Sequence, residues 1–226
     1  DFLLIAVLHM GTSGAAIATV FAQLVSVLIS LWMIRRRQLP FTFSRSCIRW
    51  DGSIIKRILK LGTPIALQDL LVGVSFLVVF AIVNSLGLIF SAGVGVAEKV
   101  CAFIMLVPAA FMQSMSAFAA QNRGAGKNDR AVRGLWTAIG ISTFFGVLMF
   151  YVAYLHGDLL CGIFAKDREI ILAGFDYLRA YAIDCLFTCF LFCFIGFYNG
   201  LGTTRFVMIQ GIAGAFCVRI PFCLFM

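Results

Sequence analysis

Two long apolar stretches decide the fold: residues 61–86 have the sequence LGTPIALQDLLVGVSFLVVFAIVNSL, and residues 91–121 have the sequence SAGVGVAEKVCAFIMLVPAAFMQSMSAFAAQ. Each is longer than the roughly 20 residues that a helix needs to cross a bilayer. The first stretch carries one full charge, Asp69, and the second carries Glu98 and Lys99 near its start. Lipid offers no partner to a charged group, so such side chains face a bundle interior, a cavity or a counter-charge. The two stretches therefore predict membrane-spanning helices with polar sides.

The composition of the whole chain predicts the same class. Of its 226 residues, 62% are hydrophobic and 12% are charged, and the mean hydropathy is +1.02. A soluble domain of this length could not bury so much apolar surface. We therefore predict an all-α membrane protein, built as a polytopic bundle of transmembrane helices. The expected spans lie near residues 15–35, 62–86, 90–121, 134–155, 177–199 and 204–226.

The net charge of +8 comes mainly from basic residues in loops between the apolar spans. Thirteen Lys and Arg residues fall in residues 35–60, 122–133 and 200–205, against two in residues 156–176. This is the positive-inside pattern of a multi-pass protein of the cell membrane. We expect the three basic loops to be cytoplasmic and the fourth to lie on the opposite side. The same distribution argues against nucleic acid as a partner.

Two polar segments carry a helical pattern of their own. Residues 53–60 (SIIKRILK) have apolar side chains at helical spacing and predict a short amphipathic helix on the membrane surface. Residues 161–175 (CGIFAKDREIILAGF) predict a second short interfacial helix. Both expectations place a separate element outside the transmembrane spans.

Cysteine spacing and motif content argue against an enzyme or a metal protein. Cys185, Cys189 and Cys193 recur every four residues inside one apolar span, so they share a helix face and serve as small hydrophobes. A metal site would need His or acidic partners, and only Asp184 is near. The chain has no P-loop, GxSxG or HExxH motif. We therefore expect no catalytic residue and no bound metal.

Polar residues inside two of the spans are candidates for ion or substrate binding. A carboxylate in a low dielectric can take up and release protons near neutral pH, and it can hold sodium together with amide and hydroxyl oxygens. The candidates are Asp184, Thr188, Asp69, Gln68 and Asn84. Asp184 and Thr188 are four residues apart and stack on one helix face. A structural ion pair between Asp184 and Arg179 is the alternative, although Arg179 lies roughly 140° around the helix.

Other charged residues and prolines in the spans have a structural interpretation. Glu98 and Lys99 are adjacent, so they point to different sides of their helix near its external end. Pro64 and Pro108 each remove a helical hydrogen bond and can bend their helices. Arg219 is expected to snorkel to the outer interface.

Several motifs, in this order, resemble one family. They are GTSGAAIATVFAQ (11–23), LGTPIALQ (61–68), VNSLG (83–87), QSMSAFAAQNRGAGKNDRA (113–131), YLRAYAID (177–184) and GFYNGLGTTRF (196–206). The chain resembles the multidrug and toxic compound extrusion (MATE) family of secondary transporters over essentially its whole length.

The resemblance implies half of a transporter with about a dozen helices in two six-helix lobes. Residues 1–34 correspond to the end of the N-lobe, a partial helix plus one transmembrane helix. Residues 35–60 correspond to the cytoplasmic linker between lobes, and residues 61–226 to the C-lobe without its last helix. The implied partners are the bilayer, a cationic small molecule and the N-lobe of the same protein. The implied activity is export of cationic, lipophilic drugs against sodium or protons, with no further cofactor.

The chain departs from the family pattern at two acidic positions. Many members carry an acid eight residues after the proline of the first C-lobe helix, where this chain has Val72. Many also carry an acid eight residues before the glycine that matches Gly196, where this chain has Thr188. In both helices an acid sits about one turn earlier, at Asp69 and at Asp184. A shifted C-lobe site and an ion site confined to the N-lobe both stay open.

Two alternatives compete with drug export. A flippase relative that moves lipid-linked sugars would line its cavity with Arg and Lys to hold an anionic substrate, whereas the spans offer chiefly Lys99, Arg179 and Arg219. A membrane-embedded enzyme would need clustered His, Asp or Glu at the membrane face, which the sequence lacks. Gradient-dependent efflux of a cationic dye would separate the three.

Overall fold

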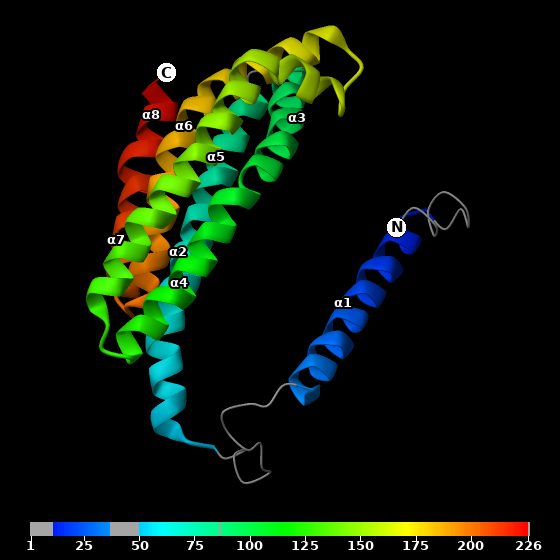
Figure 1. The fold of residues 1–226 in the computed structure, drawn as a ribbon. Coiled ribbons are helices and arrows are strands. Elements are labelled where there is room, and N and C mark those ends of the chain that lie inside the picture. The colour runs from blue at the N-terminus through cyan, green and yellow to red at the C-terminus, as the bar shows by residue number, and fades with distance from the viewer. Residues whose placement is uncertain (1–10, 37–49, 86, 226) are drawn as a thin grey trace. The chain divides into compact units, whose positions relative to one another are not determined.

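The computed structural model describes residues 11–36, 50–85 and 87–225 (Figure 1). These residues form helices and short connections, and no strand occurs among them, as predicted for an all-α membrane protein. The partial helix expected before residue 11 and most of the expected linker lie outside the described residues. The chain divides into two compact units, residues 1–51 and residues 52–226.

The first unit contains one long helix. Helix α1 (Gly11–Arg36) has apolar side chains exposed along its length and two arginines in its last turn. The Arg36 guanidinium lies 4.4 Å from the centre of the Trp32 ring. An exposed apolar helix that ends in a Trp–Arg pair has the pattern of a transmembrane helix that ends at a membrane interface.

The second unit is a bundle of long helices that run up and down with short connections (Figure 1). Its helices are α2 (Gly52–Ser85), α3 (Leu88–Ile104), α4 (Leu106–Gly124), α5 (Asn128–Gly162), α6 (Arg168–Gly200), α7 (Thr204–Ala213) and α8 (Ile220–Phe225), with a π-helical turn, η3 (Gly214–Arg219), between α7 and α8.

The two short surface helices predicted from sequence do not exist as separate elements. Residues 53–60 are the first turns of α2, whose 34 residues extend about 51 Å and exceed the roughly 30 Å thickness of the hydrocarbon. Pro64 is contained within α2, because a proline can remove one hydrogen bond without ending a helix. Residues 161–175 contain the end of α5 and the start of α6, separated by a short connection.

Pro108 interrupts its helix, as predicted. α3 ends at Ile104 and α4 begins at Leu106, with Met105 in a turn conformation between them. Pro108 has no N–H to donate to the Ile104 carbonyl four residues earlier, so the regular ladder cannot pass this point. The Ala109 N–H still donates to the Met105 carbonyl at 3.1 Å, so the two helices continue as one bent rod.

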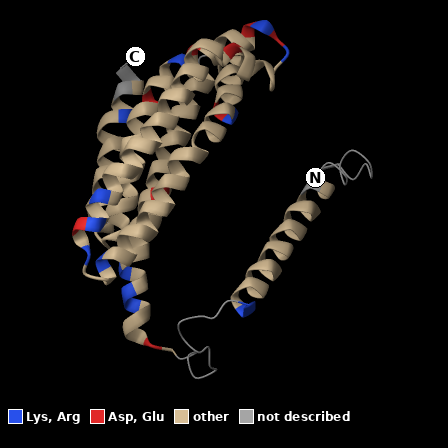
Figure 2. Ribbon diagram, in the orientation of Figure 1, with Lys and Arg blue, Asp and Glu red and all other residues tan. Residues whose placement is uncertain are grey.

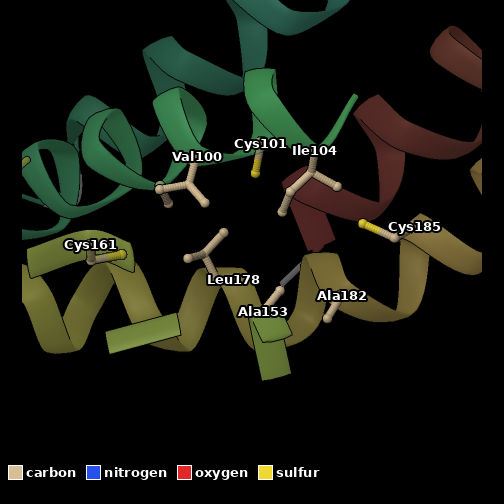
Figure 3. Close-up of a cluster of buried hydrophobic side chains, with 9 residues drawn as sticks. Val100, Cys101, Ile104, Ala153, Cys161, Leu178, Ala182 and Cys185 are labelled. Atoms are coloured by element: carbon tan, nitrogen blue, oxygen red, sulfur yellow. The ribbon is translucent and has the colours of Figure 1, made fainter. Parts of the chain in front are cut away.

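Helix α6 is the centre of the packed core, and it contacts α3, α4 and α5. Figure 3 shows side chains of one buried cluster, which come from α3, α5 and α6: Val100, Cys101, Ile104, Ala153, Cys161, Leu178, Ala182 and Cys185. A second cluster includes Met115, Leu135, Cys193 and Phe197. The cysteines of α6 are buried and unpaired, which confirms their predicted packing role, and no metal-binding group occurs among the described residues.

Glycines allow the helices to approach α6 closely. A Cβ on Gly174 would lie 2.9 Å from the Gly93 carbonyl oxygen, so α3 and α6 cross almost backbone to backbone. Gly196 meets the Met112 backbone of α4 in the same way, and Gly200 meets α4 one turn later. Small residues four apart are common where membrane helices cross. Helices in lipid gain no hydrophobic free energy by associating, so close van der Waals packing must stabilise the crossing.

The ends of the residues 52–225 bundle differ in charge. Most Lys and Arg residues gather at the end where α2 begins (Figure 2). The connections at residues 125–127 and 201–203 lie at that same end, because the helices alternate in direction, and the α5–α6 connection lies at the other. This arrangement is the one that the positive-inside pattern predicted.

Candidate ion- and substrate-binding site

Asp184 and Thr188 form a hydrogen-bonded pair on α6. The Thr188 hydroxyl donates to Asp184 Oδ2 at 3.2 Å, which confirms that the two side chains share a face. Thr188 is buried, with 5% of its surface exposed, whereas Asp184 is exposed in this chain. The Asp184 carboxylate therefore lies at the surface of the bundle, and it accepts a hydrogen bond from a hydroxyl that is buried in the packed core.

Arg179 does not neutralise Asp184. Its guanidinium lies 5.0 Å from the centre of the Tyr154 ring and 5.3 Å from that of Phe175. An arginine over aromatic faces gains cation–π attraction at those rings. The structural ion pair between Arg179 and Asp184 that the sequence left open is therefore not formed, and no basic side chain is recorded on the Asp184 carboxylate among the described residues.

The three candidates on α2 have separate surroundings. The Gln68 side chain packs on Gly211 of α7, with Nε2 2.8 Å from where a Cβ on that glycine would lie. Asp69 is exposed. Asn84, near the end of α2, accepts a short hydrogen bond from the Ser91 hydroxyl of α3. Gln68 and Asn84 are 16 residues apart, about 24 Å along the helix, so they cannot serve one ligand site together.

Helix α2 does not bring its candidates to Asp184. It packs on α3, α7, η3 and α8, and within the described residues it shares no close backbone contact with α6. The structure thus joins Asp184 to Thr188 and leaves Gln68, Asp69 and Asn84 apart from that pair. A binding role for any of the five stays a prediction.

A contact between α3 and α6 was not anticipated from sequence. The Tyr177 hydroxyl donates to Glu98 Oε1 at 2.8 Å, and the Tyr177 ring stacks on that of Tyr181 at 6.3 Å. Lys99 points elsewhere, with its amine 5.9 Å from the centre of the Phe164 ring, so the two adjacent charges do face different sides. The sequence feature that could have indicated a polar contact here is the pair of tyrosines one turn apart in the YLRAYAID motif, Tyr177 and Tyr181.

A second such contact joins η3 to α2. Arg219, which was expected to snorkel to the outer interface, is exposed, and its guanidinium lies 4.2 Å from the centre of the Phe76 ring, with Nη1 3.4 Å from the Ser75 hydroxyl. Its place relative to the interface stays a prediction. Ser75 is fully buried and donates its own proton to the Val72 carbonyl at 2.7 Å. The Ser75 oxygen can therefore accept from Arg219, and no sequence pattern pointed to this contact.

The packed core holds little free space. A cavity of about 10 Å³ beside the α3–α4 bend is lined by residues that include Pro108, Gly146, Cys185 and Cys189. That volume suits one water molecule and is far below the few hundred Å³ of a drug-sized site. This cavity in the core is therefore too small for a drug-sized ligand.

The fold and these polar groups define a class. Five helices of the described residues are long and apolar enough to cross a membrane, and the sixth predicted span, residues 204–226, is divided by η3 into shorter pieces. Polytopic bundles with carboxylates inside their spans are typical of membrane transporters.

Comparison with known proteins identifies the family. The chain belongs to the MatE family, whose sequence profile matches residues 64–225. This confirms the family resemblance found in the motifs.

Several curated relatives are similar over much of the chain. The probable multidrug resistance protein YpnP of Bacillus subtilis is 26% identical over 97% of this chain and 49% of its own length. YoeA of the same organism, also named a probable multidrug resistance protein, is 26% identical over 72% of this chain and 36% of its own length. A protein of Shewanella oneidensis named FAD transporter is 26% identical over 70% of this chain and 35% of its own length. The chain thus spans half or less of the length of these relatives.

Proposed function

We propose that this chain supplies the C-lobe of a secondary transporter that exports cationic, lipophilic drugs in exchange for sodium or protons. The observation that carries the proposal is the Asp184 carboxylate, which lies inside an apolar helix, accepts from Thr188 and has no pairing with Arg179. A carboxylate inside a membrane span costs on the order of 2.5–3.5 kcal/mol on insertion scales. Such a residue is therefore a candidate for a functional role.

Antiport follows from competition for one negative group. A proton neutralises the carboxylate, and a sodium ion can take the Asp184 oxygens and the Thr188 hydroxyl as ligands. A cationic drug needs the same carboxylate in its charged, unoccupied form. If the lobes rearrange only when the carboxylate is neutralised by one of these cations, inward movement of the ion drives outward movement of the drug.

The identity of the substrate is inferred from chemistry and from relatives. An acid on an apolar surface favours molecules that combine a positive charge with aromatic or aliphatic bulk. Two relatives are named probable multidrug resistance proteins, which supports this class. A third is named FAD transporter, so an anionic flavin nucleotide belongs in the substrate panel as a competing outcome.

The N-lobe of the same protein is the proposed partner. Transporters of this kind bind substrate between two repeats and move one against the other. The small size of the cavity in the α3–α6 core, and the share of its relatives that this chain spans, both support a binding surface completed by a second lobe. The chain alone is therefore expected not to transport.

The test uses the full-length protein that carries this chain. The protein is reconstituted in liposomes, and transport of a cationic dye is measured under an imposed proton or sodium gradient. Asp184→Asn keeps the shape and removes the charge, so the protein should fold while gradient-driven transport is lost or its ion dependence shifts strongly. Asp158→Asn, an exposed acid near the end of α5, is the matched control and should transport as the parent does.

Two results would contradict the proposal. Unchanged ion dependence in Asp184→Asn would make Asp184 structural and would favour an ion site in the N-lobe. Gradient-independent movement of a lipid-linked sugar, without dye transport, would favour the flippase alternative instead.

A further inference from the structure

The first nine residues of α2 project beyond the other helices at the basic end of the bundle (Figure 1). Leu61 marks the edge of the bundle, because its Cδ2 lies 3.6 Å from where a Cβ on Gly202 would be, in the α6–α7 connection. Residues 52–60 precede that contact, and all nine are exposed. At 1.5 Å per residue they add about 13 Å of helix. We call residues 52–60 the α2 extension.

The α2 extension has an apolar face and a basic face. Successive residues of a helix are about 100° apart, so its large apolar side chains fall within an arc of about 140° and its basic side chains fall within an arc of about 100° on the opposite side. The apolar side chains are 39–62% exposed and are those of Ile54, Ile55, Ile58 and Leu59. The basic side chains are those of Lys56, Arg57 and Lys60.

An exposed apolar face of this kind marks an interaction surface, and the basic residues define the charge that its partner must carry. The neighbouring sequence supplies little negative charge. Residues 35–60 hold eight basic residues and one acid, Asp51, and residues 122–133 hold four basic residues and one acid, Asp129. Lys and Arg also dominate this end of the bundle (Figure 2). A bilayer with anionic lipids supplies both an apolar phase and negative headgroups.

Pro64 gives the α2 extension a way to incline onto a bilayer. Proline has no N–H, so the Lys60 carbonyl four residues earlier loses its helical donor, and the proline ring crowds that carbonyl. Pro64 is buried in the bundle, whereas Lys60 is the last residue of the extension, so this weak point lies at their junction. A bend there opens the helix on the side of Pro64. The apolar face lies about 150° from that side, so the bend turns it toward the membrane.

We propose that the α2 extension binds anionic phospholipids of the cytoplasmic leaflet. Its apolar face lies against the acyl-chain boundary, and Lys56, Arg57 and Lys60 contact the headgroup phosphates. Lys56 and Arg57 border the apolar face on its two sides, where their stems cover apolar surface and their charges reach the headgroups. Each basic residue near an anionic surface raises the association constant roughly fivefold. The interaction concerns the lipid and does not depend on the transported substrate.

The experiment measures lipid binding to the purified full-length protein in detergent. The probes are phosphatidylglycerol and phosphatidylcholine with the same fluorophore on one acyl chain, and binding is followed by fluorescence anisotropy. The parent should prefer phosphatidylglycerol, and added salt should reduce the preference. The triple variant Lys56→Gln/Arg57→Gln/Lys60→Gln should bind phosphatidylglycerol about tenfold to a hundredfold more weakly and phosphatidylcholine as the parent does.

The triple variant Lys127→Gln/Arg130→Gln/Arg133→Gln is the matched control. It removes the same charge from exposed residues at the same end of the bundle, and it should keep the parent preference. Lys56→Arg/Lys60→Arg retains the charge of the α2 extension and should also keep it. Equal losses in the two Gln triple variants would make the preference a general property of the basic end and would overturn the proposal.

Other occupants of this surface give different results. If the N-lobe or a second copy of the chain covers the α2 extension, its triple variant will bind phosphatidylglycerol as the parent does, and the proposal is wrong. Displacement of the lipid by inorganic phosphate at the same concentration would show a site for free phosphate, which also contradicts it. Where the triple variant does not fold, Arg57→Gln alone should weaken phosphatidylglycerol binding roughly fivefold, and an unchanged constant refutes the proposal.

Discussion

The crossing of α4 and α6 at Gly196 gives a prediction whose size follows from the structure. A Cβ added to Gly196 would lie 3.0 Å from the Met112 Cα and carbonyl carbon and still nearer to the carbonyl oxygen. All three atoms belong to the backbone, so no rotamer change can make room and one helix must move. Overpacking of this kind costs about 1–3 kcal/mol.

Helix propensity acts in the opposite direction at this position. Alanine is better than glycine by about 1 kcal/mol inside a helix, which offsets part of the clash in Gly196→Ala. The net loss relative to the parent is therefore at most about 2 kcal/mol. For a protein of this length, each kcal/mol lowers the melting temperature by roughly 2–4 °C. We therefore expect the apparent Tm of Gly196→Ala to fall by up to about 8 °C.

A glycine without neighbours supplies the control. Gly140 of α5 has no atom within 4 Å of where a Cβ would lie, so Gly140→Ala gains propensity and meets no clash. Both variants are heated in detergent, and the surviving monodisperse fraction is measured by fluorescence-detected size exclusion. Gly140→Ala should match or exceed the parent. Equal stability of Gly196→Ala and Gly140→Ala would refute the close crossing of α4 and α6.

Two further predictions concern the core and the topology. Leu178→Ala removes a side chain with 0% exposure from the α3–α6 core and should cost about 2–5 kcal/mol, measured by the same thermal assay, whereas Leu159→Ala, at 66% exposure, should change stability little. In cells, a membrane-impermeant maleimide should label Lys166→Cys from outside, above the labelling of the parent protein. The same reagent should label Lys127→Cys only after the membrane is permeabilised. The reverse pattern would show that the predicted topology is inverted.

Class and topology could be predicted because both depend on features that are local in the sequence. Hydropathy over a window of about 20 residues identifies a span without knowledge of its neighbours. The alternation of basic loops then fixes which loops share a side, and the structure places residues 125–127 and 201–203 at one end, as expected. The prediction of a separate short helix at residues 53–60 was wrong, because these residues are the first turns of α2. The change there from polar to apolar sequence marks the point where the helix is expected to enter the membrane, and the helix does not end at that point.

The candidate site could be predicted only where a single helix determines its geometry. Asp184 and Thr188 are four residues apart, so the helical repeat alone brings them together. Tyr177 and Glu98 are 79 residues apart, and Arg219 and Ser75 are 144 apart, so tertiary packing decides both contacts. Arg219 also ends a π-helical turn, which no hydropathy pattern encodes.

Tyr177, Asp184 and Thr188 belong to one feature of α6. Asp184 follows Tyr177 by seven residues and Thr188 by eleven, so both return to within about 20° of the same side of the helix. Tyr181 lies between them in the sequence, and its ring stacks on that of Tyr177. The core residue Leu178 lies about 100° away from this line. A row of oxygen atoms thus runs for about 16 Å along the flank of the packed core, from the Tyr177 hydroxyl to the Asp184–Thr188 pair. Because Tyr177 donates to Glu98, a charge change at Glu98 and one at Asp184 act on the same side of the same helix.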